Sequence, residues 1–212
     1  MEINYFGGAY LAHATLSAWF APSPTKSDKT RHFVMTSSTI AYVGLAGYSP
    51  YAPAKAALRS LADSLRSEVN LFNGARKSSD PAIVADAPEA EVSVHIVLPG
   101  TILSPGFEEE NKTKHPVTKV LEDGDPKQSE DEVARAAIRG LERGEYMVTT
   151  QLLGYAMKAG ALGGSPRGRW LGDTVASWVA SIAWLFVGPD MENKVWAFGQ
   201  KMGVLRQNRD VQ

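Results

Sequence analysis

The sequence contains no cysteine among its 212 residues. A disulfide framework, a catalytic thiol and a zinc site with cysteine ligands are therefore excluded. An excess of either charge is also missing, because 22 Lys and Arg residues are matched by 23 Asp and Glu residues. Proteins that bind nucleic acid usually carry a strongly basic surface, so we expect no nucleic-acid partner.

The first residues also lack the basic segment and the long apolar stretch of a secretory signal, so we expect no signal peptide. What is present is the composition of an ordinary globular protein, with 44% hydrophobic and 21% charged residues. A chain of this length can bury a sizeable core.

Hydrophobic periodicity predicts three helices. The first covers residues 3–20, which are small and apolar on all sides and are therefore expected to be buried. The second covers residues 50–71, with Ser49 as the N-cap and Pro50 in the first turn. The third follows a capping box at residues 129–132 and runs to about Arg143.

Three β-prone runs alternate with these helices and predict strands over 32–38, 92–98 and 146–149, the first of them buried. The segments 73–90 and 101–128 are polar and rich in turn residues, which predicts a long surface loop and a loop or lid. Helices and strands that alternate in this way predict an α/β fold with a parallel sheet.

Residues 175–187 are uncharged and contain two tryptophans. This stretch is too short to span a bilayer by itself. Two interpretations stand: a helix of the core, or a segment that lies in a membrane interface.

Tyr51 and Lys55 are a candidate catalytic pair. Their spacing of four places both side chains on one helix face. A nearby ammonium group lowers the pKa of a phenol, which would suit the pair to general acid or base catalysis at a carbonyl or alcohol. On its own, the pair is also typical of a solvated helix face. Ser38 ends the preceding strand and Pro99 follows the next one, and ligands of parallel sheets bind at such strand ends.

Together these residues resemble the short-chain dehydrogenase/reductase family. The motifs are Thr36-Ser37-Ser38, Tyr51-x-x-x-Lys55, Pro99-Gly100-x-x-x-Ser104 and, on the first helix, Asn4. A narrower resemblance, to the 3-ketosphinganine reductases, rests on the runs 4–7, 44–51 and 104–116.

The family resemblance implies a role for each catalytic residue. Tyr51 would protonate the ketone oxygen, and Lys55 would lower the pKa of Tyr51 and hold the nicotinamide ribose. Ser38 would orient the substrate carbonyl, and Asn4 would fix a water molecule for proton resupply.

The resemblance also implies a cofactor, NADPH, bound by Tyr51 and Lys55 and by a further set of residues after the second strand. Those residues are Pro99, Gly100, Ile102 and Ser104. The four histidines are scattered, and residues 108–110 are interpreted as a solvated acidic patch, so no metal site is expected.

By this resemblance the chain is the C-terminal part of a doubly wound, Rossmann-like parallel sheet, and its N-terminal strands are missing. Residues 1–150 would form the catalytic half of a reductase domain, and residues 151–212 a C-terminal extension with an apolar segment that would associate with a membrane. The glycine-rich turn that receives a pyrophosphate is not found in the sequence. We therefore expect the isolated chain to bind NADPH weakly.

The implied function is NADPH-dependent reduction of 3-ketosphinganine to sphinganine, in a homo-oligomer at the cytosolic face of the endoplasmic reticulum membrane. Two alternatives remain open at this stage. One is a truncated, non-catalytic fragment that acts only in binding or oligomerisation. The other is a reductase of another lipid ketone or of a steroid ketone.

Overall fold

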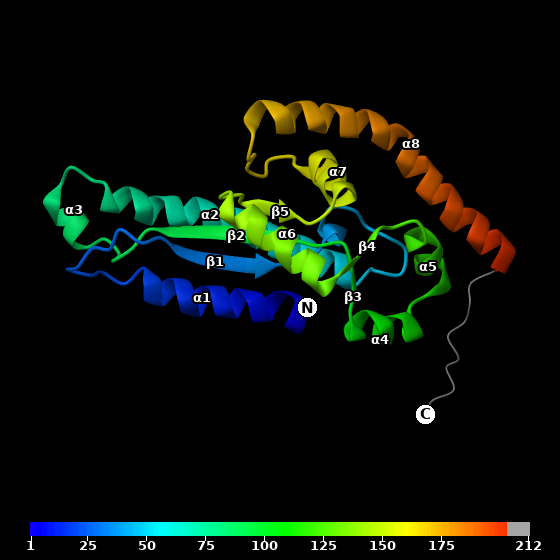
Figure 1. Ribbon diagram of the computed structural model, residues 1–212, viewed down its shortest axis with the longest axis horizontal. Helices are drawn as coiled ribbons and strands as arrows, with labels where there is room; N and C mark the ends of the chain where they lie inside the picture. The colour runs from blue at the N-terminus through cyan, green and yellow to red at the C-terminus, as the bar shows by residue number, and fades with distance from the viewer. Residues whose placement is uncertain (203–212) are drawn as a thin grey trace.

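The main sheet has three parallel strands in the order β1-β2-β5. The structure of the chain is a computed structural model, which describes the backbone of residues 1–202 and the side chains of residues 1–197. The strands are β1 (Arg31–Thr36), β2 (Val92–Leu98) and β5 (Met147–Thr149). A two-stranded parallel sheet, β3 (Thr101–Leu103) with β4 (Lys127–Ser129), lies beyond the carboxyl end of β2 (Figure 1). The parallel, Rossmann-like α/β arrangement expected from the sequence is confirmed.

Two helices, α1 (Gly7–Trp19) and α2 (Tyr51–Arg76), pack on one face of this sheet. The core is formed by apolar side chains of both helices and of all three strands, with β2 buried along almost its whole length. Members of this core include Ala12, Leu16, Phe33, Met35, Leu58, Ala62, Val94, Ile96, Leu98 and Met147.

The helix α6 (Glu130–Glu142) packs against β5 through Gly140, because a Cβ there would lie 2.4 Å from the side chain of Val148. It begins at the expected capping box: Ser129 accepts a hydrogen bond from the backbone N–H of Glu132, whose side chain accepts from the Ser129 N–H. The predictions for β2, β5 and α6 are confirmed within about one residue.

The prediction of a fully buried first helix is wrong. Residues 2–6 form a π-helical turn, η1 (Glu2–Phe6), which continues into α1, and in α1 only Ala12 and Leu16 are buried. One side of α1 packs on the core, and no other segment among residues 1–202 covers the opposite side, so Tyr10 and Leu11 are exposed. The strand β1 is likewise buried on one face only, and Val34 on its other face is 42% exposed.

Both segments expected to be loops contain helices. Residues 101–128 hold β3, α4 (Pro105–Thr113), α5 (Pro116–Glu122) and most of β4. Pro105 and Pro116 start helices, because Ser104 and His115 act as N-caps and proline at the first helical position costs no hydrogen bond. In the segment 73–90, α2 continues to Arg76 and a short helix, α3 (Pro81–Ala85), follows the N-cap Asp80. The helix α2 itself has Pro50, not Ser49, at its N-cap.

The C-terminal part consists of α7 (Leu152–Ala161) and the long helix α8 (Trp170–Met202), which runs over α7 and then bends toward α5 (Figure 1). Residues 175–187 lie within α8. The interpretation as a core helix is wrong, because only 6% of the most apolar window of Trp170–Ala197 is buried. With a mean hydropathy of 1.4 in that window, α8 is long and apolar enough to cross a membrane.

Candidate active site

A cleft of about 320 Å³ opens at the carboxyl ends of β1 and β2, where parallel sheets bind their ligands. Six of the eight residues singled out in the sequence line it. They are Ser38, Tyr51, Pro99, Gly100, Ile102 and Ser104. The remaining two, Asn4 and Lys55, lie outside its lining.

Ser38 follows β1 directly and is the N-cap of a short 3₁₀ helix, η2 (Thr39–Ala41), where its hydroxyl accepts a hydrogen bond from the N–H of Ile40. The backbone on either side of Ser38 is tied to the end of β2. The N–H of Ser37 donates to the carbonyl of Val97 at 2.8 Å, and the N–H of Thr39 donates to the carbonyl of Pro99 at 2.9 Å. The parallel pairing of β1 and β2 therefore holds Ser38 beside the residues that follow β2.

Tyr51 is the first residue of α2, and its side chain reaches into the same cleft. Burial raises the pKa of Tyr51 above its usual value of 10.0, while a hydrogen bond with Ser38 lowers it. The carboxylate of Glu110 adds to the rise, the ammonium group of Lys114 opposes it, and the net pKa is raised. At neutral pH the phenol is thus protonated, which is the form that a proton donor to a ketone requires.

Lys55 lies one helical turn beyond Tyr51, with its Nζ 5.5 Å from the centre of the Tyr51 ring. Burial lowers the pKa of Lys55. Both side chains are partly buried, so the pair does not form a solvated face. In this structure the cation that lowers the pKa of Tyr51 is Lys114, and the corresponding role of Lys55 stays a prediction.

Asn4 lies in η1, which packs against α2 near its start. Its side chain is partly buried and does not reach the cleft lining. The predicted water-holding role of Asn4 therefore stays a prediction.

The residues expected to hold a nicotinamide ring are placed around one corner of the cleft. Gly100 closely approaches Gln151, since a Cβ at Gly100 would lie 2.1 Å from its Nε2. The Oε1 atom of Gln151 is buried and has no hydrogen-bond partner among the described residues. A carboxamide N–H is a group that could satisfy this acceptor, so this corner fits the nicotinamide end of the cofactor. The hydroxyl of Ser104 accepts a hydrogen bond from the Phe107 N–H and so caps α4.

The sequence reasoning missed a cluster of charged side chains at the other end of the cleft. The Nζ of Lys114 lies 2.7 Å from Glu122 and 3.0 Å from Glu110, and its side chain is only 3% exposed. The hydroxyl of Tyr48 lies 2.8 Å from the Oε1 of Glu110 and 2.6 Å from the Oε1 of Glu122. Residues 108–110 are exposed, as expected for a solvated patch, and Glu110, with a side chain that is 47% exposed, also lines the cleft. The one available signal was the spacing of four between Glu110 and Lys114.

The hydrogen bond between Ser38 and Tyr51 leads to a testable shift in a pKa. Because this bond lowers the pKa of Tyr51, Ser38→Ala should raise it further, and phenolate absorbance should appear at higher pH. The Tyr51 contribution is isolated by subtracting the titration of Tyr51→Phe, measured with and without Ser38→Ala. An unchanged Tyr51 titration in Ser38→Ala would contradict the assigned contact.

The sequence of the chain was compared with protein-family models and with curated proteins. No protein-family model matches the chain. Among curated proteins, it is 47% identical over 207 residues to a 3-ketodihydrosphingosine reductase of Aspergillus fumigatus and 42% identical over 205 residues to one of Neurospora crassa. A third reductase of this name, from Cryptococcus neoformans, is 36% identical over 178 residues.

The three alignments cover 96%, 96% and 84% of this chain and 56%, 52% and 46% of the respective relatives. The chain thus spans about half the length of the curated relatives it matches. It is homologous, over nearly all of its own length, to the 3-ketodihydrosphingosine reductases.

Proposed function

We propose that the cleft at the ends of β1 and β2 reduces the ketone of 3-ketodihydrosphingosine (3-ketosphinganine) to the alcohol, with NADPH as the reductant. The observation that carries this proposal is the meeting of the Ser38 and Tyr51 hydroxyls at the strand ends, in a chain 47% identical to a reductase of that name. An acid and an orienting hydroxyl are the two groups that a ketone oxygen needs.

In the proposed reaction, Tyr51 donates its proton to the ketone oxygen as that oxygen becomes an alkoxide. The hydroxyl of Ser38 donates a hydrogen bond to the same oxygen and fixes its position. When bound, the cofactor supplies the hydride that adds to the carbonyl carbon, so one proton and one hydride convert the ketone to an alcohol. Lys55 would hold the ribose, and Pro99, Gly100 and Ile102 would line the nicotinamide.

Assays of the 212-residue chain and of a chimera test this function. In the chimera the chain replaces the matching 207-residue segment of the Aspergillus fumigatus reductase, whose remaining part stays in place. We expect the chimera to oxidise NADPH in the presence of 3-ketodihydrosphingosine, and much more slowly with a steroid ketone. A folded chimera that reduces neither ketone would contradict the proposed function and favour a role in binding or oligomerisation alone. A preference for the steroid would contradict the assigned substrate.

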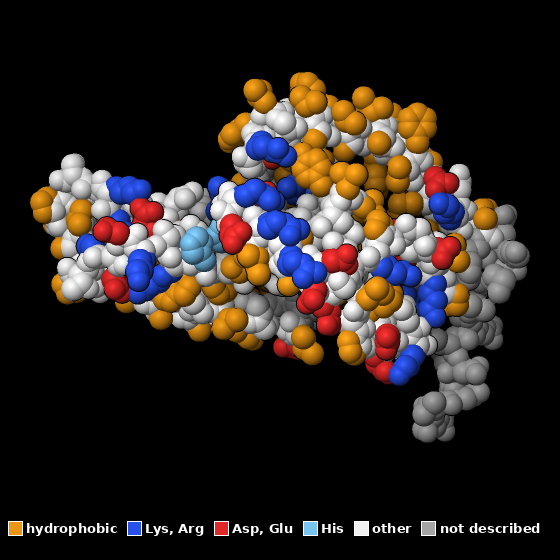
Figure 2. Space-filling model, viewed as in Figure 1, with side chains coloured by type: hydrophobic (Ala, Val, Ile, Leu, Met, Phe, Trp, Pro, Cys, Tyr) orange, Lys and Arg blue, Asp and Glu red, His pale blue; other side chains and the backbone are white. Residues whose placement is uncertain are grey.

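We also propose that α8 attaches the protein to a membrane, at the cytosolic face of the endoplasmic reticulum. Its outward surface carries a row of apolar side chains at helical spacing (Figure 2). They are Leu171, Val175, Trp178, Ile182 and Leu185, which are between 53% and 86% exposed. The opposite side of α8 is fixed to α7, where the Ser177 hydroxyl donates to the carbonyl of Ala159 at 2.8 Å. An exposed row of this kind favours burial in the interface of a bilayer.

This attachment predicts that Trp178→Glu lowers binding to vesicles of phosphatidylcholine and phosphatidylserine by about tenfold or more, because a buried aromatic side chain is replaced by a charge. Leu71→Glu is the matched control, since Leu71 is 75% exposed but lies on α2. Sedimentation with the vesicles measures both variants. Equal losses in the two variants would show that α8 is not the attachment surface.

A further inference from the structure

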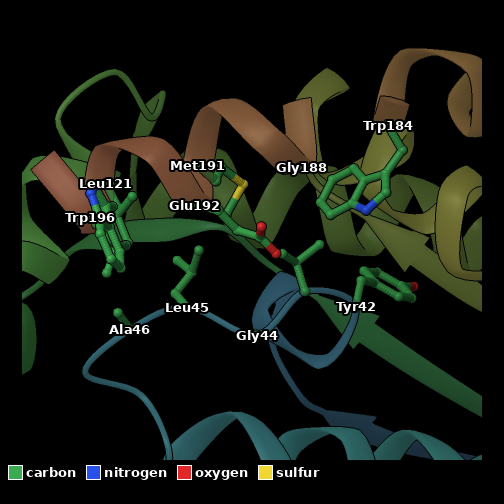
Figure 3. A pocket seen from close by; sticks show the side chains of 12 residues that line it. Tyr42, Gly44, Leu45, Ala46, Leu121, Trp184, Gly188, Met191, Glu192 and Trp196 are labelled. Atoms are coloured by element: carbon green, nitrogen blue, oxygen red, sulfur yellow. The ribbon is translucent and has the colours of Figure 1, made fainter. Parts of the chain in front are cut away.

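A second cleft, of about 830 Å³, lies between α8, α5 and the segment 42–46 (Figure 3). Its volume is within the range of about 300–1,000 Å³ that is usual for small-molecule sites. The lining is mostly apolar and includes Leu45, Ala46, Leu121, Trp184, Met191 and Trp196. Glu192 is the only charged residue among those that line the cleft.

The shape of α8 creates this cleft. Pro189 lies inside the helix, where a proline removes one backbone hydrogen bond and bends the helix. Residues before the bend, such as Trp184, and residues after it, such as Met191 and Trp196, therefore face the same space. Figure 3 shows Leu45 and Ala46 on the facing segment below α8.

The apolar cleft adjoins the candidate active site at Leu45. Leu45 lines both clefts, and the rest of the segment 42–46 follows η2, whose N-cap is Ser38. A ketone whose oxygen lies at Ser38 and Tyr51 would carry its substituents past Leu45 and toward α8. The first cleft, of about 320 Å³, is lined by several polar groups and suits the polar end of such a molecule.

We propose that the cleft under α8 binds the alkyl chain of the lipid ketone, so that the bent half of α8 forms part of the substrate site. This inference rests on the function proposed above. Burial of each additional methylene group should tighten binding roughly fourfold until the cleft is filled. The bent helix would then join the membrane-facing surface of α8 to the site of reduction, and a lipid could pass between them.

Photolabelling of the full chain tests the location of the alkyl chain. The probe is a long-chain 2-amino-3-ketone with a diazirine at the far end of its chain, and a second probe carries the diazirine next to the ketone. We expect the first probe to label 42–46, Leu121 or the residues of α8 that line the cleft (Trp184, Met191 and Trp196), and the second to label the cleft that holds Ser38 and Tyr51. Labelling confined to the outward row on α8, or the same labelled residues with both probes, would overturn the proposal.

A substitution that fills the cleft gives an independent test. A Cβ at Gly44 would meet no other atom within 4 Å, and Gly44 is not among the glycines with positive φ, so Gly44→Phe can fold and occupy the cleft. In a homologous series of 2-amino-3-ketones, Gly44→Phe should weaken binding of the longest member more than tenfold and leave the shortest unchanged. Gly74→Phe, also in open space but on α2, should behave as the parent chain. Equal affinities in Gly44→Phe and the parent would overturn the proposal.

These outcomes can be separated from those of the function assay. A chimera that reduces 3-ketodihydrosphingosine while its affinity is independent of chain length would overturn the alkyl-chain site and leave the reductase function standing. An inactive chimera with end-specific labelling under α8 would overturn the function and leave a lipid-binding cleft.

Discussion

Replacement of Tyr51 by phenylalanine in the chimera is expected to lower kcat for ketone reduction by about 10²–10⁴-fold, the usual contribution of a general acid. The variant removes the phenolic proton and keeps the ring. The ring packs beside Tyr48, with a centroid separation of 5.5 Å, and beside the ammonium group of Lys55. Because those contacts remain, we expect the fold to survive, and circular dichroism should show an unchanged spectrum.

The rate of reduction by the parent chimera should also fall at alkaline pH. Reduction requires the protonated phenol, and burial raises the pKa of Tyr51 above 10.0. The activity should therefore persist through neutral pH and be lost only as the pH passes the raised pKa. In the reverse direction, alcohol oxidation requires the phenolate, so its rate should increase over the same pH range.

Tyr48→Phe is the matched control for Tyr51→Phe, because it also removes one hydroxyl from the same cleft and keeps a ring. The hydroxyl of Tyr48 contacts Glu110 and Glu122, whereas Ser38 contacts Tyr51. We expect Tyr48→Phe to retain most of kcat. Comparable turnover in Tyr51→Phe and the parent would contradict the assigned acid, and a collapse of kcat in Tyr48→Phe would transfer that role to Tyr48.

The meeting of Ser38, Tyr51 and Pro99 could be predicted from the sequence because it follows from general rules of parallel sheets. Two adjacent strands that run in the same direction end at the same edge, and the helix between them starts there. The apolar run of β2 and the capping box of α6 are local signals, and both elements formed where they were expected. Local sequence therefore specified the parts of the site that lie at the ends of regular elements.

Features that depend on distant contacts could not be predicted in the same way. The apolar composition of α1 and of residues 175–187 suggested burial, but composition does not reveal which faces find a partner. Both helices are apolar and largely exposed in the structure. Pro105 and Pro116 resembled loop signals, whereas they occupy the first turns of α4 and α5 after N-capping residues.

The cluster around Lys114 in the candidate active site also depends on contacts between distant parts of the chain, so it could not be predicted from the local sequence. Glu110 on α4 and Lys114, the C-cap of α4, are four residues apart, a spacing that resembles an ordinary exposed ion pair. Its burial depends on Glu122 in α5 and on Tyr48, which lies far earlier in the chain. The ammonium group also lies over two rings, 5.4 Å from the centre of Tyr48 and 5.1 Å from that of Phe107. Only the folded chain brings these groups together.

Lys114→Met is therefore expected to lower the free energy of unfolding by about 3 kcal/mol, as for the loss of one partner from a buried ion pair. Lys112→Met is the matched control, because Lys112 pairs with Glu109 at the surface, with a side chain that is 68% exposed. Lys112→Met should lower the free energy of unfolding by less than about 1 kcal/mol. Urea denaturation measures both variants, and equal losses would show that the buried cluster does not stabilise the fold.

The difference in the free energy of unfolding between the parent and Lys114→Met depends on pH through the pKa of Lys114. Burial lowers that pKa, but hydrogen bonds to Glu122 and Glu110 outweigh it, and the net pKa lies above 10.5. A raised pKa in the folded state stabilises the protein below pH 10.5 and ceases to do so as the pH rises through the folded value. The difference in the free energy of unfolding between the parent and Lys114→Met should thus be constant near neutral pH and become smaller in strongly alkaline solution.

Much of the loss in Lys114→Met should come from the charge left behind on Glu122, whose side chain is only 16% exposed. Adding Glu122→Gln to Lys114→Met removes that unpaired charge and should recover part of the stability. Glu122→Gln alone should destabilise, because it takes a charged partner from the buried ammonium group. If the double variant were instead as unstable as the sum of the two single variants, the residues would act independently, and Lys114 would stabilise the fold through packing alone.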